Sequence, residues 1–149
     1  MRAIVQRVDQ ASVDSTVDGV TTRVGEIGQG LMVLVGVTHT DTEQTAVKLA
    51  DKIWNLRIMS DADGVMNLSV ADTTRNILIV SQFTLYGDAS GGRRPSWIAA
   101  AKPEVAEPLV TKVIEELRRL GAHVETGRFR TDMKVAFVND GPVTVTIDI

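Results

Sequence analysis

The chain contains no cysteine among its 149 residues and only two histidines. The lack of cysteine excludes disulfide scaffolds, thiolate nucleophiles and cysteine-ligated metal sites. His39 and His123 have no histidine or carboxylate partner at the spacing that metal sites use. We therefore expect both to be surface or loop residues, and we expect a protein that needs no metal and no cofactor.

Long apolar runs and an excess of positive charge are also missing. The longest apolar run, residues 31–37, is far too short to span a membrane, and the first eight residues lack the apolar core of a signal peptide. We expect no membrane association and a cytoplasmic location. The net charge of −3 argues against broad, non-specific nucleic-acid binding. It leaves local patches open, because Arg93, Arg94 and Lys102 share one loop and Arg128, Arg130 and Lys134 share another, although solvated loop charges are the default interpretation.

The hydrophobic pattern that is present predicts an α+β protein. Alternating or apolar segments at residues 3–8, 11–17, 20–27 and 31–37 indicate an antiparallel meander with Gly-rich turns. A capping-box pattern from Thr40 to Glu43 predicts the start of one helix, and apolar spacing predicts a second over residues 104–120. Further strands are expected at 77–80, 135–138 and 143–149. The prediction is a single domain over residues 1–149, a largely antiparallel sheet or partial barrel with two packed helices.

Two polar motifs follow apolar strands and single out a candidate site. The first spans residues 81–86 (SQFTLY) and the second residues 139–144 (NDGPVT). Buried polar groups cost free energy unless they are paired, so two such strand ends point to a site lined by backbone and hydroxyl groups. Thr84 is the one tempting nucleophile, but no base stands near it in sequence. We therefore favour a hydrogen-bonding role for its hydroxyl.

These motifs resemble those of the D-aminoacyl-tRNA deacylases. The likeness extends to the N-terminal segment 1–8 and to segments 25–28, 55–58, 66–69, 94–96 and 125–129, in order and at the family's spacing. It covers essentially the whole chain. The family resemblance implies an editing hydrolase that cleaves the ester of D-aminoacyl-tRNA, and glycyl-tRNA as well, at the acceptor end of the tRNA.

The resemblance also implies roles for particular residues. It implies a homodimer with a shared active site, in which Ser81 and the backbone amides of Gln82, Phe83 and Thr84 face Gly141 and Pro142 of the partner subunit. In the family the Gly-Pro bond is cis and excludes L-amino acids, while the 2′-hydroxyl of the tRNA's terminal adenosine activates water. The remaining substrate-binding residues implied in this way are Asn139, Arg7, which orients the Gly-Pro segment, and the adenosine-pocket residues Phe129, Met133 and Phe137.

Two departures from the family pattern and two alternatives stay open. Arg130-Thr131 replaces the usual Gly-Ala, which leaves the local backbone and the adenosine contacts open, and Trp97 replaces a frequent Phe. One alternative is a related deacylase with a trans Gly-Pro bond that accepts small L-aminoacyl-tRNA. The other is a non-enzymatic nucleic-acid-binding module on the same fold, which would need an extended basic surface.

Overall fold

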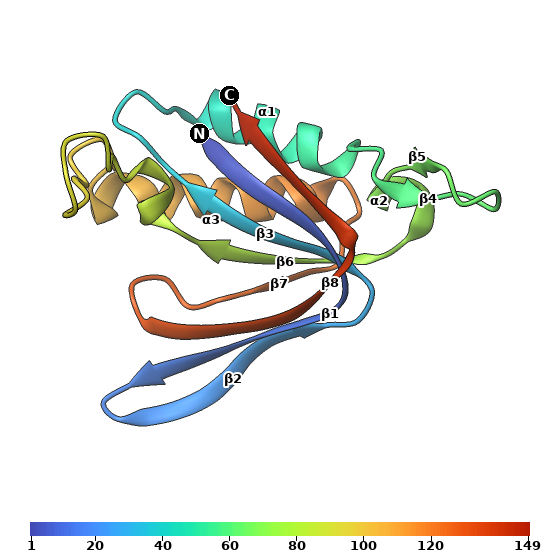
Figure 1. The fold of residues 1–149 in the computed structure, drawn as a ribbon, viewed down its shortest axis with the longest axis horizontal. Coiled ribbons are helices and arrows are strands. Elements are labelled where there is room, and N and C mark those ends of the chain that lie inside the picture. Colours follow the sequence, from blue (N-terminus) through green and yellow to red (C-terminus); the bar gives the residue numbers. More distant parts are fainter.

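The long strand β1 (Arg2–Val17) organises the sheet in this computed structural model, which describes all of residues 1–149. One edge of β1 pairs antiparallel with β2 and β3, and the other edge pairs antiparallel with β8. Strands β6 and β7 continue the sheet beyond β3 in parallel orientation (Figure 1). The other elements are β2 (Val20–Ile27), β3 (Gly30–Gly36), α1 (Glu43–Trp54), β4 (Met59–Ser60), β5 (Met66–Leu68), α2 (Val70–Thr73), β6 (Asn76–Ser81), η1 (Phe83–Tyr86, a 3₁₀ helix), α3 (Pro103–Arg119), β7 (Val124–Thr126) and β8 (Asp132–Asp148).

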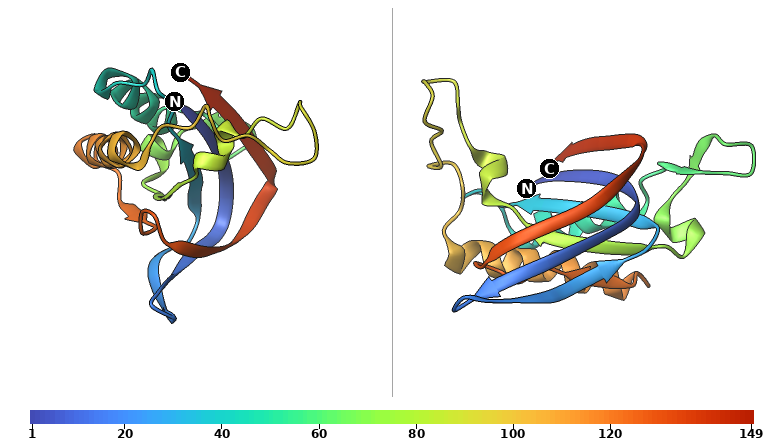
Figure 2. Two further views of the ribbon diagram at one scale, coloured as in Figure 1. Left: turned by 90° about the vertical axis from the view of Figure 1, so that its left-hand side faces the viewer. Right: turned by 60° about the horizontal axis from the view of Figure 1, so that its bottom comes forward.

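The central strands β3 and β6 are buried on both faces, which explains their continuous apolar sequences. Leu31 and Val33 face a large core that α1 and α3 cover. Met32 and Leu78 face a second, smaller core, which the far halves of β1, β2 and β8 enclose. Figure 2 shows the resulting strong curvature of the sheet, with α1 and α3 together on one side. The sheet is therefore nearly closed around its second core.

The predicted α+β class and the two long helices are confirmed, and several details differ. The sheet is mixed, because β6 and β7 are parallel to their neighbours. The two segments expected at 3–8 and 11–17 form the single strand β1, and those at 135–138 and 143–149 belong to the single strand β8. A four-residue helix, α2, and the 3₁₀ helix η1 were not expected.

The expected capping box at Thr40 is wrong by two residues. Helix α1 is capped by Thr42, whose hydroxyl accepts from the amide of Thr45 at 3.3 Å. Asp41 belongs to the turn before the helix, where its carboxylate accepts a hydrogen bond from the amide of Thr38 at 2.7 Å. The overlapping Thr-Asp-Thr-Glu sequence offers two capping registers, and this turn selects the second. No helix of the structure has both the length and the apolar character needed to cross a membrane.

Candidate active site

The first polar motif turns sharply where β6 ends. The amide of Gln82 donates to the carbonyl of Val35 at 2.7 Å, which extends the pairing with β3 by one residue, and η1 begins at Phe83. Gly36 permits this close approach, because a methyl group there would lie 3.1 Å from both the Gln82 carbonyl oxygen and Leu85 Cβ. A larger residue at position 36 would push η1 away from the sheet.

The start of η1 presents hydrogen-bond donors in an exposed position. The first amides of a helix, here those of Phe83 and Thr84, have no partner within the helix. Thr84 is exposed, and its hydroxyl oxygen accepts from the Gln82 side-chain amide. No acid or base contacts this hydroxyl, so nothing in the chain activates it as a nucleophile. The arrangement therefore suits donation by the Phe83 and Thr84 amides to a developing oxyanion rather than covalent attack by the Thr84 hydroxyl.

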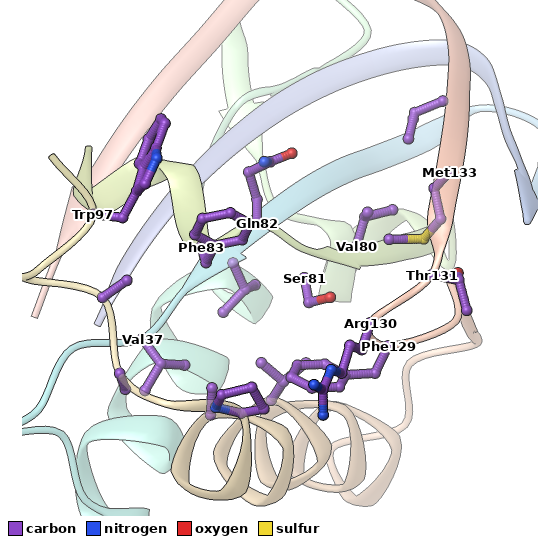
Figure 3. A pocket seen from close by; sticks show the side chains of 17 residues that line it. Val37, Val80, Ser81, Gln82, Phe83, Trp97, Phe129, Arg130, Thr131 and Met133 are labelled. Carbon is purple, nitrogen blue, oxygen red and sulfur yellow. The ribbon is translucent and has the colours of Figure 1, made fainter. Parts of the chain in front are cut away.

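A cavity of about 630 Å³ opens beside this motif, between the ends of β3 and β6, the first turns of α3 and the start of β8 (Figure 3). Phe83 and Trp97 meet edge to face in its wall, with ring centroids 5.6 Å apart. Most of the lining is apolar. It consists of Val35, Val37, Val80, Ser81, Gln82, Phe83, Trp97, Ala100, Ala101, Pro103, Ala106, Val110, Phe129, Arg130, Thr131, Met133 and Val135.

The cavity brings together five of the residues predicted from sequence. Ser81, Gln82 and Phe83 come from the end of β6 and the start of η1, while Phe129 and Met133 come from the opposite wall. Phe137 is placed elsewhere: it lines a separate cavity of about 290 Å³ together with Arg23 and Glu26, and it is 39% exposed. Sequence reasoning missed the wall that α3 contributes, because its apolar residues read as ordinary core.

The second polar motif bulges out of β8. The pairing register between β1 and β8 jumps from Gln6 opposite Thr144 to Val8 opposite Asn139, which leaves Gly141-Pro142 unpaired and exposed. The peptide bond between them is cis, and Gly141 has φ of +124°. Asn139 fixes the bulge, because its side-chain oxygen accepts from the Val143 amide at 2.9 Å and its side-chain NH₂ donates to the Thr144 hydroxyl at 2.9 Å.

Arg7 lies behind the Gly-Pro bulge and is 8% exposed. Its Nη1 donates to the Ile58 carbonyl at 2.9 Å. Its Nε lies 2.8 Å from an Asp140 carboxylate oxygen, within ion-pair distance but without hydrogen-bond geometry. A methyl group on Gly141 would lie 3.1 Å from Arg7 Nη2 and 2.7 Å from Val143 Cγ2. The guanidinium therefore supports the bulge from the side away from solvent.

Arg2 holds the first motif in a similar way, a role that sequence reasoning missed. Its Nη1 donates to the Leu85 carbonyl at 2.9 Å, and its guanidinium lies 5.1 Å from the centroid of the Tyr86 ring. A hydrogen bond with Asp148 raises the pKa of Arg2, and burial raises the pKa of Tyr86. The end of the first motif is thus tied to β1, whereas its start is tied to β3 through the Gln82 amide.

The two motifs lie far apart within one chain. Arg2 contacts the first motif and Arg7 the second, and these residues are five positions apart on β1. At about 3.3 Å per residue the separation is about 17 Å along the strand. No residue of the segment 139–142 lines the cavity.

Nowhere in the chain do three or more His, Asp or Glu side chains gather as metal ligands would.

Solved structures first define the class of protein. The fold matches a structure described as a probable eukaryotic D-amino acid tRNA deacylase, with a TM-score of 0.83 at 20% identity over 99% of this chain and 98% of that one. It also matches a structure described as c-Myc DNA Unwinding Element Binding Protein, with a TM-score of 0.91 at 38% identity over 100% and 99%. By fold, the chain is a single-domain α+β protein of the class that these two structures represent.

Sequence comparison gives the family itself. The family profile described as D-Tyr-tRNA(Tyr) deacylase matches residues 4–148. Proteins named D-aminoacyl-tRNA deacylase from Thermobifida fusca and Streptomyces coelicolor are 57% and 55% identical to this chain, each covering 100% of both sequences. One from Neisseria meningitidis is 51% identical over 99% of this chain and 91% of its own length. The chain belongs to the D-aminoacyl-tRNA deacylase family, hydrolases of the aminoacyl-tRNA ester bond.

Proposed function

We propose that this protein hydrolyses the ester bond of D-aminoacyl-tRNA in the cytoplasm and spares L-aminoacyl-tRNA. The observation that carries the proposal is the exposed start of η1, which offers backbone donors directly beside an aromatic-lined cavity. The cavity is in the size range of sites for small ligands, so it can hold the terminal adenosine while the ester reaches the donors. Its lining by Phe83 and Phe129 supports stacking of a base.

The active site is proposed to form between two copies of the chain. Gly141-Pro142 is exposed and lines no part of the cavity of its own chain, and the arginines that contact the two motifs stand about 17 Å apart along β1. The outer edge of β8 pairs with no other strand, and Phe137 and Val138 on this strand are 39% and 48% exposed. A two-fold dimer, the commonest symmetric assembly, would cover these groups and bring each bulge to the cavity of the other subunit.

Selectivity in this proposal comes from backbone atoms. The substrate's ammonium donates to carbonyl groups of the bulge, a charge-assisted contact. An L-side chain held by the same ammonium contact points into Gly141 and Pro142 of the partner subunit, while a D-side chain points away. Arg7 and Asn139 prevent the bulge from yielding. Glycine has no side chain to reject and is hydrolysed as well.

The proposed chemistry is substrate-assisted. A water oxygen attacks the ester carbonyl carbon, and the tRNA's terminal 2′-hydroxyl orients this water and relays its proton. The amides of Phe83 and Thr84 stabilise the oxyanion that forms. Cleavage of the bond to the 3′-oxygen then returns the proton to that oxygen, and the products are a free D-amino acid and tRNA. The absence of an acid or base beside Thr84 supports this scheme.

The test compares hydrolysis of D-tyrosyl-tRNA and L-tyrosyl-tRNA by the purified protein. We expect fast release of D-tyrosine and little release of L-tyrosine. Thr84→Ala should keep substantial activity, whereas a substrate with a 2′-deoxy terminal adenosine should be hydrolysed about 10²–10⁴-fold more slowly. Normal turnover of the deoxy substrate, combined with loss of activity in Thr84→Ala, would make Thr84 the nucleophile and refute the scheme.

Two other outcomes would identify the alternatives. Preferential hydrolysis of small L-aminoacyl-tRNA would show the related L-specific deacylase. Binding of nucleic acid without hydrolysis would identify a non-enzymatic binding module. The observation that supports this second function is the likeness to the structure described as c-Myc DNA Unwinding Element Binding Protein. The net charge of −3 weighs against this second function.

A further inference from the structure

Arg130 is the one charged side chain that lines the large cavity. The other lining residues are apolar, apart from Ser81, Gln82 and Thr131, and no carboxylate is among them. Figure 3 shows Arg130 beside Phe129, across the cavity from Trp97 in this view. A lone guanidinium in a largely apolar cavity gives the site a fixed positive charge. An anionic group is therefore the ligand chemistry that this wall favours.

The Arg130 guanidinium has no partner within the chain. It takes part in no ion pair and no hydrogen bond, whereas Arg2, Arg7, Arg23 and Arg119 are each paired with a carboxylate. The side chain is exposed, so a ligand entering the cavity can reach it. A guanidinium that no carboxylate competes for keeps its donors available for a bidentate contact.

The backbone at Arg130 is held in an unusual conformation. Its φ is +58°, a left-handed value that costs a non-glycine residue about 1 kcal/mol or more. The next residue fixes this turn, because the Thr131 hydroxyl donates to the Arg128 carbonyl at 2.9 Å and accepts from the hydroxyl of the buried Ser15 at 2.8 Å. Glycine would adopt this backbone without strain. An arginine at this position therefore carries a conformational cost that glycine would not.

We propose that Arg130 binds the 5′-phosphate of the nucleotide whose base occupies the cavity. Aromatic side chains such as Phe129 and Phe83 supply stacking surfaces for a base, and a guanidinium matches two oxygens of a phosphate. The site thus distinguishes a nucleotide from a nucleoside. The identification of this nucleotide as the terminal adenosine of the tRNA acceptor end rests on the proposed function.

The test measures binding of two probes, 5′-AMP and adenosine, by calorimetric titration at low salt. The wild-type protein should bind 5′-AMP about tenfold or more tightly than adenosine. In Arg130→Gln the two affinities should become nearly equal, with adenosine binding unchanged. Arg128→Gln is the matched control, because it removes the same charge two residues away, outside the cavity, and it should keep the wild-type preference.

Arg130→Gly guards against an effect of misfolding. This variant also loses the guanidinium, but it relieves the left-handed backbone, so its thermal midpoint should equal or exceed that of the wild type. It should lose the preference for 5′-AMP as Arg130→Gln does. An unchanged preference in either variant, an equal loss in Arg128→Gln, or no saturable binding of 5′-AMP up to about 10 mM, well above typical ligand affinities, would overturn the proposal.

The titration is independent of turnover, so it separates this inference from the proposed function. A protein that prefers 5′-AMP through Arg130 but leaves D-tyrosyl-tRNA intact would refute the proposed function and keep the phosphate site. A protein that hydrolyses D-tyrosyl-tRNA while Arg130→Gln keeps its preference for 5′-AMP would refute the phosphate site alone.

Discussion

Replacing Asn139 by alanine should loosen the Gly-Pro bulge and reduce selectivity between D- and L-substrates. The Asn139 side chain makes two hydrogen bonds across the bulge, to the Val143 amide and to the Thr144 hydroxyl. Water can replace the contact with the exposed Thr144 at little cost. The Val143 amide is partly buried, and leaving such a group without a partner costs about 1–3 kcal/mol.

We expect a loss of about 1–2 kcal/mol, because the Val143 site is only partly buried. For a chain of this length each kcal/mol lowers the thermal midpoint by about 2–4 °C, so the midpoint should fall by about 2–8 °C. Thermal unfolding of wild type and variant should be compared at one protein concentration, since assembly makes the midpoint depend on concentration. The ratio of D-tyrosyl-tRNA to L-tyrosyl-tRNA hydrolysis should also fall.

Asn139→Asp is the matched control. Its carboxylate keeps the acceptor for the Val143 amide, and the Thr144 hydroxyl can rotate to donate to it. This variant should lie within about 0.5 kcal/mol of wild type and keep the selectivity. If Asn139→Ala unfolds at the wild-type temperature and still discriminates between D- and L-substrates, then the Asn139 hydrogen bonds do not position the bulge and our account of its rigidity is wrong.

Two further predictions concern the fold. Gly30→Ala should destabilise the protein by about 3 kcal/mol or more in urea unfolding, because the added methyl would clash with the carbonyl oxygen of Asn76 on the paired strand. Gly28→Ala is the control: its added methyl would have no atom within 4 Å, so the free energy of unfolding should stay within about 0.5 kcal/mol of wild type. Hydrogen bonds from Ser69 lower the pKa of Asp72, so this carboxylate stabilises the fold above about pH 4 and the contribution fades as the pH falls below that value. The stability deficit of Asp72→Asn should therefore be larger at pH 7 than at pH 3, and a deficit independent of pH would contradict this.

The sequence predicted the strands and long helices because their hydrophobic patterns are local. It did not predict that β6 and β7 are parallel to β3, since periodicity gives the faces of a strand but not its neighbours. The run 31–37 is apolar on both faces because cores lie on both sides of β3. The second core forms only because residues 132–138 of β8 pair with residues 10–16 of β1 and close the sheet around it. A local sequence pattern carries no information about this pairing.

The candidate site was predicted only in part for the same reason. Ser81, Gln82 and Phe83 stand together in sequence, so their common position followed from the strand end. Arg2 and the first turns of α3 reach the site through the tertiary fold. Phe137 was assigned to the cavity by resemblance, but its place opposite Ala11 on β1 directs it to another cavity in the single chain.

The pairing of β1 with β8 has a consequence for synthesis on the ribosome. Residues 2–16 pair with residues 132–148, so one edge of β1 stays unpaired until β8 has been synthesised. At about 5–20 residues per second the intervening chain takes several seconds to appear. During that time one edge of β1 has unpaired amides and carbonyls beside apolar side chains, an arrangement that favours wrong strand pairing. Contacts of such long sequence separation also slow folding. Completion of this sheet therefore waits until β8 has left the ribosome, and until then the open edge of β1 favours aggregation or chaperone capture.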